Sequence, residues 1–315
     1  MTQTPNENRP ETWFGQSLWS GAGIAQQEFP PGLYVVATPL GNVADVTLRA
    51  LWILRLADCV AVEDTRTTAP LLARYGIVNR LVALHQHNEA KASAQILQRL
   101  QRGQRVALVS DAGTPAICDP GALLVRAALQ AGVRVLPVPG ASSLTAALSV
   151  AGVRAGPIHF LGFAPARAAV RKRLWSLLAA QEAAALLFEA PHRMLATARE
   201  LSAALESTRR VVLLRELTKQ FESVVATSAG ELAKLVESAP PRGEYVLVID
   251  AQEAARSPEG QEPARSVQID AVTARWLAVL REELPASRAA AIAAKASGLP
   301  RASLYRALGQ QEESV

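Results

Sequence analysis

Residues 106–121 read VALVSDAGTPAICDPG, and this stretch decides the fold. Its first residues form a short apolar run rich in valine, which predicts a buried strand ending at Ser110. The residues after Ser110 are mostly small or turn-forming. A helix is expected over 121–130, ended by Gly132. A buried strand that leads through a small-residue turn into a helix is the repeating unit of α/β sheets.

The same unit recurs on both sides of this stretch. Further strands are predicted at 33–38, 59–62, 81–84 and 133–138, with helices at 45–56 and 89–102. Such alternation over about 120 residues predicts a largely parallel sheet, whose ligands bind beyond the carboxyl ends of the strands. Four loops are expected at that edge: PLGN (39–42), EDTR (63–66), SDAGTP (110–115) and PGASS (139–143).

The sequence after residue 151 predicts a hinge, a second α/β domain, a linker and a helical module. GVRAG (152–156) reads as a hinge, and apolar runs beyond it indicate a second sheet. A polar segment with two prolines reads as a linker, and the residues after it as three short helices. The expected organisation is a disordered tail (1–31), two α/β domains (32–152 and 153–250), a linker (251–266) and a helical module (267–310).

Composition narrows the class of protein. Of 315 residues, 50% are hydrophobic and 19% charged, which is typical of a globular chain. Two cysteines cannot form a disulfide framework or a cysteine-based zinc site, and they fit a reducing cytoplasm. We expect neither a membrane span nor a signal peptide, because no apolar run reaches about 18 residues and the N-terminus is polar. A P-loop and a dinucleotide fingerprint are absent from the sequence.

The positive charge is local. The chain carries +5 overall, but residues 154–219 hold eleven Lys and Arg against five Asp and Glu. Residues 167–173 form a basic helix start, which fits either a solvated helix face or a patch that contacts phosphates. Residues 285–310 carry four basic residues and no acid. Two basic segments therefore indicate candidate nucleic-acid surfaces.

Two loops of the first domain each allow a second interpretation. The SDAGTP turn fits ligand binding, because glycine permits close approach to the backbone, and equally a tight turn with Asp111 as a local cap. PGASS places small residues at a helix start, where a ligand could bind, although N-capping by Ser142 or Ser143 explains it as well.

Other polar motifs have structural alternatives too. The EDTR charges fit a surface ion pair. His85 and His87 share a face but lack a third metal ligand, and Asn88 fits a helix cap. FEAPHR (188–193) and RELTK (215–219) both end strands, so they are expected at one rim, as functional groups or as a salt-bridge cluster.

Taken together and in order, the motifs show a resemblance. VVATPLGNVADVTLRAL (35–51), AVEDTR, HQHNE, LVSDAGTPAICDPG, VPGASS, FEAPHR, RELTK and RGEYVLVI resemble the tetrapyrrole-methylase-like (class III) S-adenosylmethionine-dependent methyltransferases. More narrowly, they resemble the branch that 2′-O-methylates a cytidine in the decoding centre of 16S rRNA. The resemblance covers about residues 32–310. It implies two α/β domains with S-adenosylmethionine between them, a small C-terminal helical module, a homodimer and no metal.

The resemblance also assigns roles to residues of this sequence. It implies donor binding by Pro39, Gly41, Asp111, Gly113, Thr114, Pro115, Ser142, Ser143, Phe188 and Gly243. The first loop is Thr-Pro-Leu-Gly-Asn where tetrapyrrole methylases usually have a Gly-x-Gly-Pro-Gly type, and this departure favours the RNA branch. Methylation of a 2′-hydroxyl would be helped by a general base or a polarising cation, for which the candidates are Glu63, Asn88, Glu189 and Lys219, with Asp64 and Glu216 also considered.

The expected partner is 16S rRNA, free or in an assembled small subunit. The expected RNA contacts are Arg167, Arg171, Lys172, Arg173, Arg193, Arg215, Arg288, Lys295, Arg301 and Arg306. Two alternatives stay open: a methyltransferase of the cobalamin or sirohaem pathway on the same fold, and a non-catalytic RNA-binding protein. The basic segments argue against the first, and the intact loops argue against the second.

Overall fold

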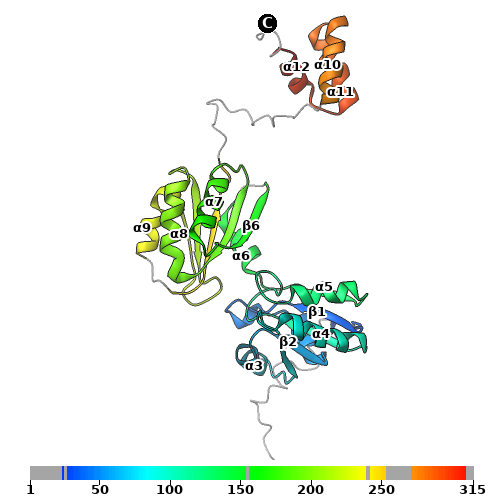
Figure 1. The fold of residues 1–315 in the computed structure, drawn as a ribbon, viewed down its shortest axis with the longest axis vertical. Helices are drawn as coiled ribbons and strands as arrows, with labels where there is room; N and C mark the ends of the chain where they lie inside the picture. Colours follow the sequence, from blue (N-terminus) through cyan, green and yellow to red (C-terminus); the bar gives the residue numbers. More distant parts are fainter. Residues whose placement is uncertain (1–22, 25–26, 154–155, 239–241, 253–270, 310–315) are drawn as a thin grey trace, which may run out of the picture. The chain divides into compact units, whose positions relative to one another are not determined.

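The computed structural model describes residues 23–24, 27–153, 156–238, 242–252 and 271–309. The chain divides into two compact units, residues 1–254 and 255–315, and the first unit contains two sheets (Figure 1). Most of the expected tail and linker, and part of the expected hinge, lie outside the described residues. Ile24 is described, and it is buried against the first sheet.

The first sheet has five parallel strands in the order β3-β2-β4-β1-β5. They are β1 (Gly32–Val36), β2 (Cys59–Val62), β3 (Leu81–Ala83), β4 (Arg105–Val109) and β5 (Val135–Val138). One apolar cluster includes α2 (Leu48–Leu56) and α3 (Thr65–Arg74), and a second includes α4 (Glu89–Gln101) and α5 (Ala122–Gln130). Apolar packing on both faces explains the continuous apolar runs and confirms the predicted parallel α/β sheet.

The second sheet has the order β6-β7-β10-β8-β9 and is mixed. Only β6 and β7 pair in parallel. The strands are β6 (Ile158–Phe163), β7 (Ala184–Glu189), β8 (Arg210–Arg215), β9 (Ser223–Ser228) and β10 (Tyr245–Ile249). Because β7 and β8 both run antiparallel to β10, their carboxyl ends lie at one edge, as predicted for FEAPHR and RELTK.

Helices from both halves of the first unit pack on this second sheet. One apolar cluster joins it to α7 (Ala168–Ala179), α8 (Pro191–Ala204) and α9 (Ala229–Glu237). A separate cluster joins Ala147 and Ala151 of α6 (Ser143–Ala151) to Leu186, Leu214 and Val248 of the sheet. The helix that follows the PGASS loop of the first sheet is therefore part of the core of the second.

Three elements differ from the sequence-based expectation. Strand β9 was not predicted, because it lies at the sheet edge with Val224 and Val225 exposed, and an edge strand lacks a clean apolar pattern. Helix α3 was not predicted either, since its first turn is polar. The helix expected from residue 45 begins at Leu48, where the Thr47 side chain accepts a hydrogen bond from Ala50 N, after a 3-10 turn at Val43–Asp45.

The second unit contains the three predicted helices, α10 (Ala271–Glu283), α11 (Ala286–Ser297) and α12 (Arg301–Gly309). They enclose a small core that includes Leu277, Leu304 and Leu308. Three buried alanines of α11 allow close packing. Among all the described residues, no helix is long and apolar enough to cross a membrane.

Candidate active site

The loops at the carboxyl edge of the first sheet are bonded to one another. Thr38 and Gly113 exchange two backbone hydrogen bonds, with N–O distances of 2.9 and 3.0 Å. The Thr114 hydroxyl donates to the Ala141 carbonyl at 3.1 Å, and Asp64 N donates to Asp111 Oδ1 at 3.1 Å. The predicted meeting of the four loops is therefore confirmed.

Gly113 of the SDAGTP loop and Gly140 of the PGASS loop are closely packed. Gly113 has a φ of +76°, and a Cβ there would lie 3.0 Å from Leu40 Cδ2. A Cβ on Gly140 would lie 3.0 Å from that of Ala37. Ala116 and Cys118 also have positive φ values, 64° and 65°. Strained backbone of this kind clusters at ligand sites.

Ser142 occupies the N-cap position of α6, but its side chain makes no capping hydrogen bond. Ser143 is the first residue of the helix rather than its cap. Ser142 is therefore the N-cap residue by position, but its hydroxyl is not used for capping, and the PGASS loop is bonded to the SDAGTP loop through Thr114 and Ala141.

Three carboxyl groups lie near one another at this edge. Burial raises the pKa of Glu63, and the nearby charges of Asp119 and Asp111 raise it further. Burial also raises the pKa of Asp111 and of Asp119, and Asp119 feels the charge of Glu244 from the second sheet. Carboxyl groups with raised pKa values accept protons more readily near neutral pH than free carboxylates do.

These shifts predict a pH-dependent gain in stability for Glu63→Gln. A raised pKa in the folded state contributes stability below the unfolded pKa, and that stability is lost as the pH rises through the folded pKa. At pH 7 the variant should therefore melt about 1–2 °C above the parent, since partial exposure weakens the effect. Below pH 4 the two should melt together. Thermal scans from pH 3.5 to 8, with the exposed Asp45→Asn as control, measure this. A variant that melts lower than the parent at pH 7 contradicts it.

The RELTK loop places a lysine between two glutamates. Lys219 Nζ lies 2.9 Å from Glu216 Oε1 and 3.2 Å from Glu244 Oε2. Glu216 Oε1 also accepts a hydrogen bond from Glu244 N at 2.9 Å. Burial pushes the pKa of Lys219 down, but the two carboxylates outweigh burial and leave the pKa raised. Lys219 is thus a cation, which fits the polarising role and not that of a general base.

The same loop touches the first sheet. Asn42 N donates to Thr218 Oγ1 at 3.3 Å, and a Cβ on Gly41 would overlap Cγ of Lys219. Glu216 and Thr218 have positive φ values of 52° and 65°. An open pocket of ≈ 590 Å³ lies at this contact and is lined by residues of both loops and by Arg74. The loops of the two sheets therefore meet at Gly41 and Lys219.

The other two catalytic candidates are held by internal hydrogen bonds. Asn88 is the N-cap residue of α4, as predicted, but its side chain makes no capping hydrogen bond: its Oδ1 accepts from His85 N at 2.8 Å and its Nδ2 donates to Ala83 O. The Glu189 side chain is fully buried. It accepts hydrogen bonds from Thr197 Oγ1 at 2.5 Å and Ala190 N at 2.9 Å.

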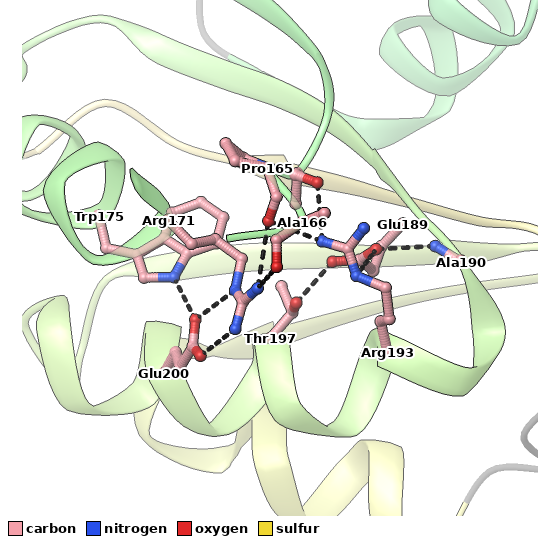
Figure 2. A network of polar contacts seen from close by, with 10 residues as sticks. Pro165, Ala166, Arg171, Trp175, Glu189, Ala190, Arg193, Thr197 and Glu200 are labelled. Atoms are coloured by element: carbon pink, nitrogen blue, oxygen red, sulfur yellow. Dashed lines mark hydrogen bonds and ion pairs between the residues drawn. The ribbon is translucent and has the colours of Figure 1, made fainter. Parts of the chain in front are cut away.

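Figure 2 shows that two candidate RNA contacts point inward. Arg171 pairs with Glu200 and donates to the carbonyls of Pro165 and Ala166. Arg193 lies 3.3 Å from Glu189 and donates to the carbonyls of Ala164 and Pro165. The two guanidinium groups therefore hold the loop between β6 and α7, and only the exposed members of the basic helix start remain available to a ligand.

The remaining residues that were predicted to contact RNA fall into three groups. Arg215 donates to Arg242 O and lies over the Tyr245 ring, so it is partly engaged. The side chain of Arg306 lies outside the described residues. The exposed cations are Arg167, Lys172, Arg173, Arg288, Lys295 and Arg301.

Phe188 lies near the carboxyl end of β7, and Gly243 lies just before β10, which pairs with it. The Phe188 ring packs edge-on against Phe160 and Phe163, at 5.2 and 5.5 Å between centroids. Gly243 has a φ of +91°, and a Cβ there would lie 2.7 Å from Glu216 Cδ. Within the described residues, no group of three or more His, Cys, Asp or Glu side chains could hold a metal ion.

Sequence reasoning missed four contributors to this site. Asn42 and Thr218 join the two sheets, and Asp119 and Glu244 extend the acidic edge. Asp119 carried a signal, because it ends the same turn as Asp111. The contact between Asn42 and Thr218 spans 176 residues, and no local pattern reports it.

The chain resembles known proteins along most of its length. Residues 32–233 match the tetrapyrrole (corrin/porphyrin) methylases, and residues 267–311 match the RsmI C-terminal HTH domain. Ribosomal RNA small subunit methyltransferase I of Neisseria meningitidis serogroup B is 43% identical over 275 residues, 87% of this chain and 91% of that protein. The Pseudomonas aeruginosa protein of the same name is 42% identical over 285 residues, 90% of this chain and 98% of its own.

A solved structure shares the fold. Uroporphyrin-III C-methyltransferase from Thermus thermophilus, crystallised with S-adenosyl homocysteine, superposes with a TM-score of 0.50 at 20% identity, over 70% of this chain and 97% of that one. The two-sheet fold and its bonded loops thus define a methyltransferase of the tetrapyrrole-methylase class, as the motifs predicted. Within that class, the chain belongs to the ribosomal RNA small subunit methyltransferase I family, whose members are rRNA methyltransferases.

Proposed function

We propose that this protein transfers a methyl group from S-adenosylmethionine to the ribose 2′-oxygen of a cytidine in the decoding centre of 16S rRNA. The observation that carries the proposal is that Lys219 lies where the loops of the two sheets meet, on the side of the carboxyl groups Glu63, Asp111 and Asp119. Lys219 packs on Gly41 of the first sheet, and Asp119 of the first sheet feels Glu244, the partner of Lys219. Attack by a hydroxyl is helped by a polarising group and by a proton acceptor, and both kinds of group occur here.

The small-residue loops fit the donor. Gly113 and Gly140 keep these loops free of side chains where Leu40 and Ala37 pack closely, and glycine permits a ligand to approach the backbone. The Ser142 and Ser143 hydroxyls are suited to polar groups of the donor, and Asp111 belongs to the SDAGTP loop, which Thr114 bonds to the PGASS loop. S-adenosylmethionine supplies an activated methyl group on a sulfonium.

The chain's own residues then act on the acceptor. The 2′-oxygen forms the new bond to the methyl carbon while the carbon–sulfur bond breaks, and its electron pair stays on sulfur. Lys219 lowers the energy of the developing alkoxide, and Glu63, with its raised pKa, takes the proton. Alignment of the two reactants can supply about 7–11 kcal/mol of the lowering of the barrier. Glu189 positions the second-sheet edge rather than touching the acceptor.

The acceptor class is tested by offering the protein different acceptors in separate reactions. The purified protein is incubated with methyl-labelled donor and, in parallel, with small ribosomal subunits, free 16S rRNA and a tetrapyrrole precursor. We expect label in the 16S rRNA, presented free or in the subunit. Label confined to the tetrapyrrole, or label in no acceptor, contradicts the proposal.

The helical module is proposed to dock the RNA. Arg288, Lys295 and Arg301 are exposed, and none has an ion-pair partner within the described part of the chain. Deleting residues 267–315 should therefore weaken RNA binding at least about tenfold and lower the salt dependence by roughly one unit per lost phosphate contact. Filter binding of RNA and calorimetry of the donor measure the two affinities. The full chain with Arg288, Lys295 and Arg301 changed to alanine tests the same contacts without removing the helices. Equal loss of RNA and donor binding would count against the assignment.

A further inference from the structure

The pocket at the contact between the two sheets contains a second cation that neither the motifs nor the charge pattern marked. Arg74 ends α3 and lines the pocket with Gly41, Asn42 and Lys219. The charge of Lys219 is matched by Glu216 and Glu244. Among the described residues, Arg74 has no carboxylate within ion-pair distance. Of the two described cations that line the pocket, Arg74 is therefore the one whose guanidinium is not engaged by a described carboxylate.

An exposed aromatic ring follows the pocket directly in sequence. Gln220 lines the pocket, and Phe221, the next residue, is 65% exposed. Phe221 is among the most exposed large apolar side chains of the described chain. A free guanidinium and an exposed ring are the two groups with which proteins bind single-stranded nucleic acid, through phosphate and base respectively.

We propose that Arg74 and Phe221 form a subsite for a nucleotide that flanks the methylated one, with Arg74 on a phosphate and Phe221 stacked on a base. The inference rests on the proposed function, because it assigns the RNA path at the same site. It places the acceptor strand across the Gly41–Lys219 contact, so that the strand is held beside the polarising cation. The surface position of Arg74 at a helix C-terminus is also favourable for the helix itself, but a dipole contact would leave RNA binding unchanged.

Replacing each of the two side chains should change RNA binding in a different way. Arg74→Ala should raise the KM for RNA about threefold to tenfold and lower the slope of log affinity against log salt by about one. Phe221→Ala should raise the KM about tenfold and leave the salt slope unchanged, while Phe221→Tyr should restore it. Both variants should keep the parent's donor affinity and its kcat at saturating RNA. Arg126→Ala, an exposed arginine on α5, is the matched control.

The outcomes separate this subsite from the function itself. If the parent protein neither binds nor methylates RNA, the proposed function fails. If the parent methylates RNA and both variants behave like Arg126→Ala, the subsite alone is wrong. A change of oligomeric state in Phe221→Ala with an unchanged KM, seen by light scattering, would make the ring a contact between copies of the chain and would overturn the stacking role.

Discussion

Lys219→Ala is expected to lower kcat about 100- to 1,000-fold, the effect of removing one preorganised group that stabilises a developing oxyanion. The reason is that Lys219 remains protonated between Glu216 and Glu244 and lies against Gly41, where the loops of both sheets meet. Single-turnover methylation of RNA measures the rate, and calorimetry of S-adenosylhomocysteine measures donor binding.

A matched variant separates charge from packing. Lys219→Arg keeps the cation, so it should retain more activity than Lys219→Met, which keeps only the aliphatic stem that covers Gly41. If Lys219→Ala turns over within twofold of the parent while donor binding is intact, the polarising role of Lys219 is wrong.

The largest effect on stability is expected for Glu189→Ala, which should lower the free energy of unfolding by about 3 kcal/mol, the lower end of the range for breaking a buried ion pair. The Glu189 carboxylate is fully buried and bonds to Thr197 and Ala190 N beside Arg193. Its removal leaves the Arg193 guanidinium, only 25% exposed, with carbonyl partners alone.

Urea denaturation measures this loss. Glu189→Gln keeps an oxygen for the Thr197 hydroxyl and should cost clearly less than Glu189→Ala. The exposed pair of Arg199 and Glu237 gives a control, since Glu237→Ala should cost at most about 1 kcal/mol. A loss below 1 kcal/mol for Glu189→Ala would show that the network in Figure 2 does not support the second sheet.

The sequence predicted the first sheet well because its strands are buried on both faces. Cys59–Val62 is a strand with the predicted bounds, and all four residues are buried. The strand that leads into SDAGTP and the helix after it were also found, because a continuous apolar run and a small-residue turn are local signals. Gly132 follows α5 with a φ of +68°, as expected for a glycine after a helix end.

The polar side chains were harder to assign, because their partners are distant in sequence. Arg171 was predicted to contact RNA, but Glu200 and the carbonyls of Pro165 and Ala166 engage it. For Arg193 the salt-bridge alternative is confirmed, because Glu189 is its partner. The pocket could not be predicted for the same reason, because Arg74 and Thr218, which both line it, are distant in sequence and come from the parts of the chain that form the two sheets. Local pattern thus predicts which residues end the strands, but only tertiary structure shows which of them are free to bind.

The most direct test of the account is to map the methyl group on the RNA. Small subunits that lack the modification are methylated by the purified protein, and their 16S rRNA is subjected to partial alkaline hydrolysis, which cannot cleave next to a 2′-O-methyl ribose. We expect a single gap in the ladder at a cytidine of the decoding centre, and we expect this gap to be absent when Lys219→Ala is used. Incorporated label with an uninterrupted ladder would place the methyl group on a base and contradict the account.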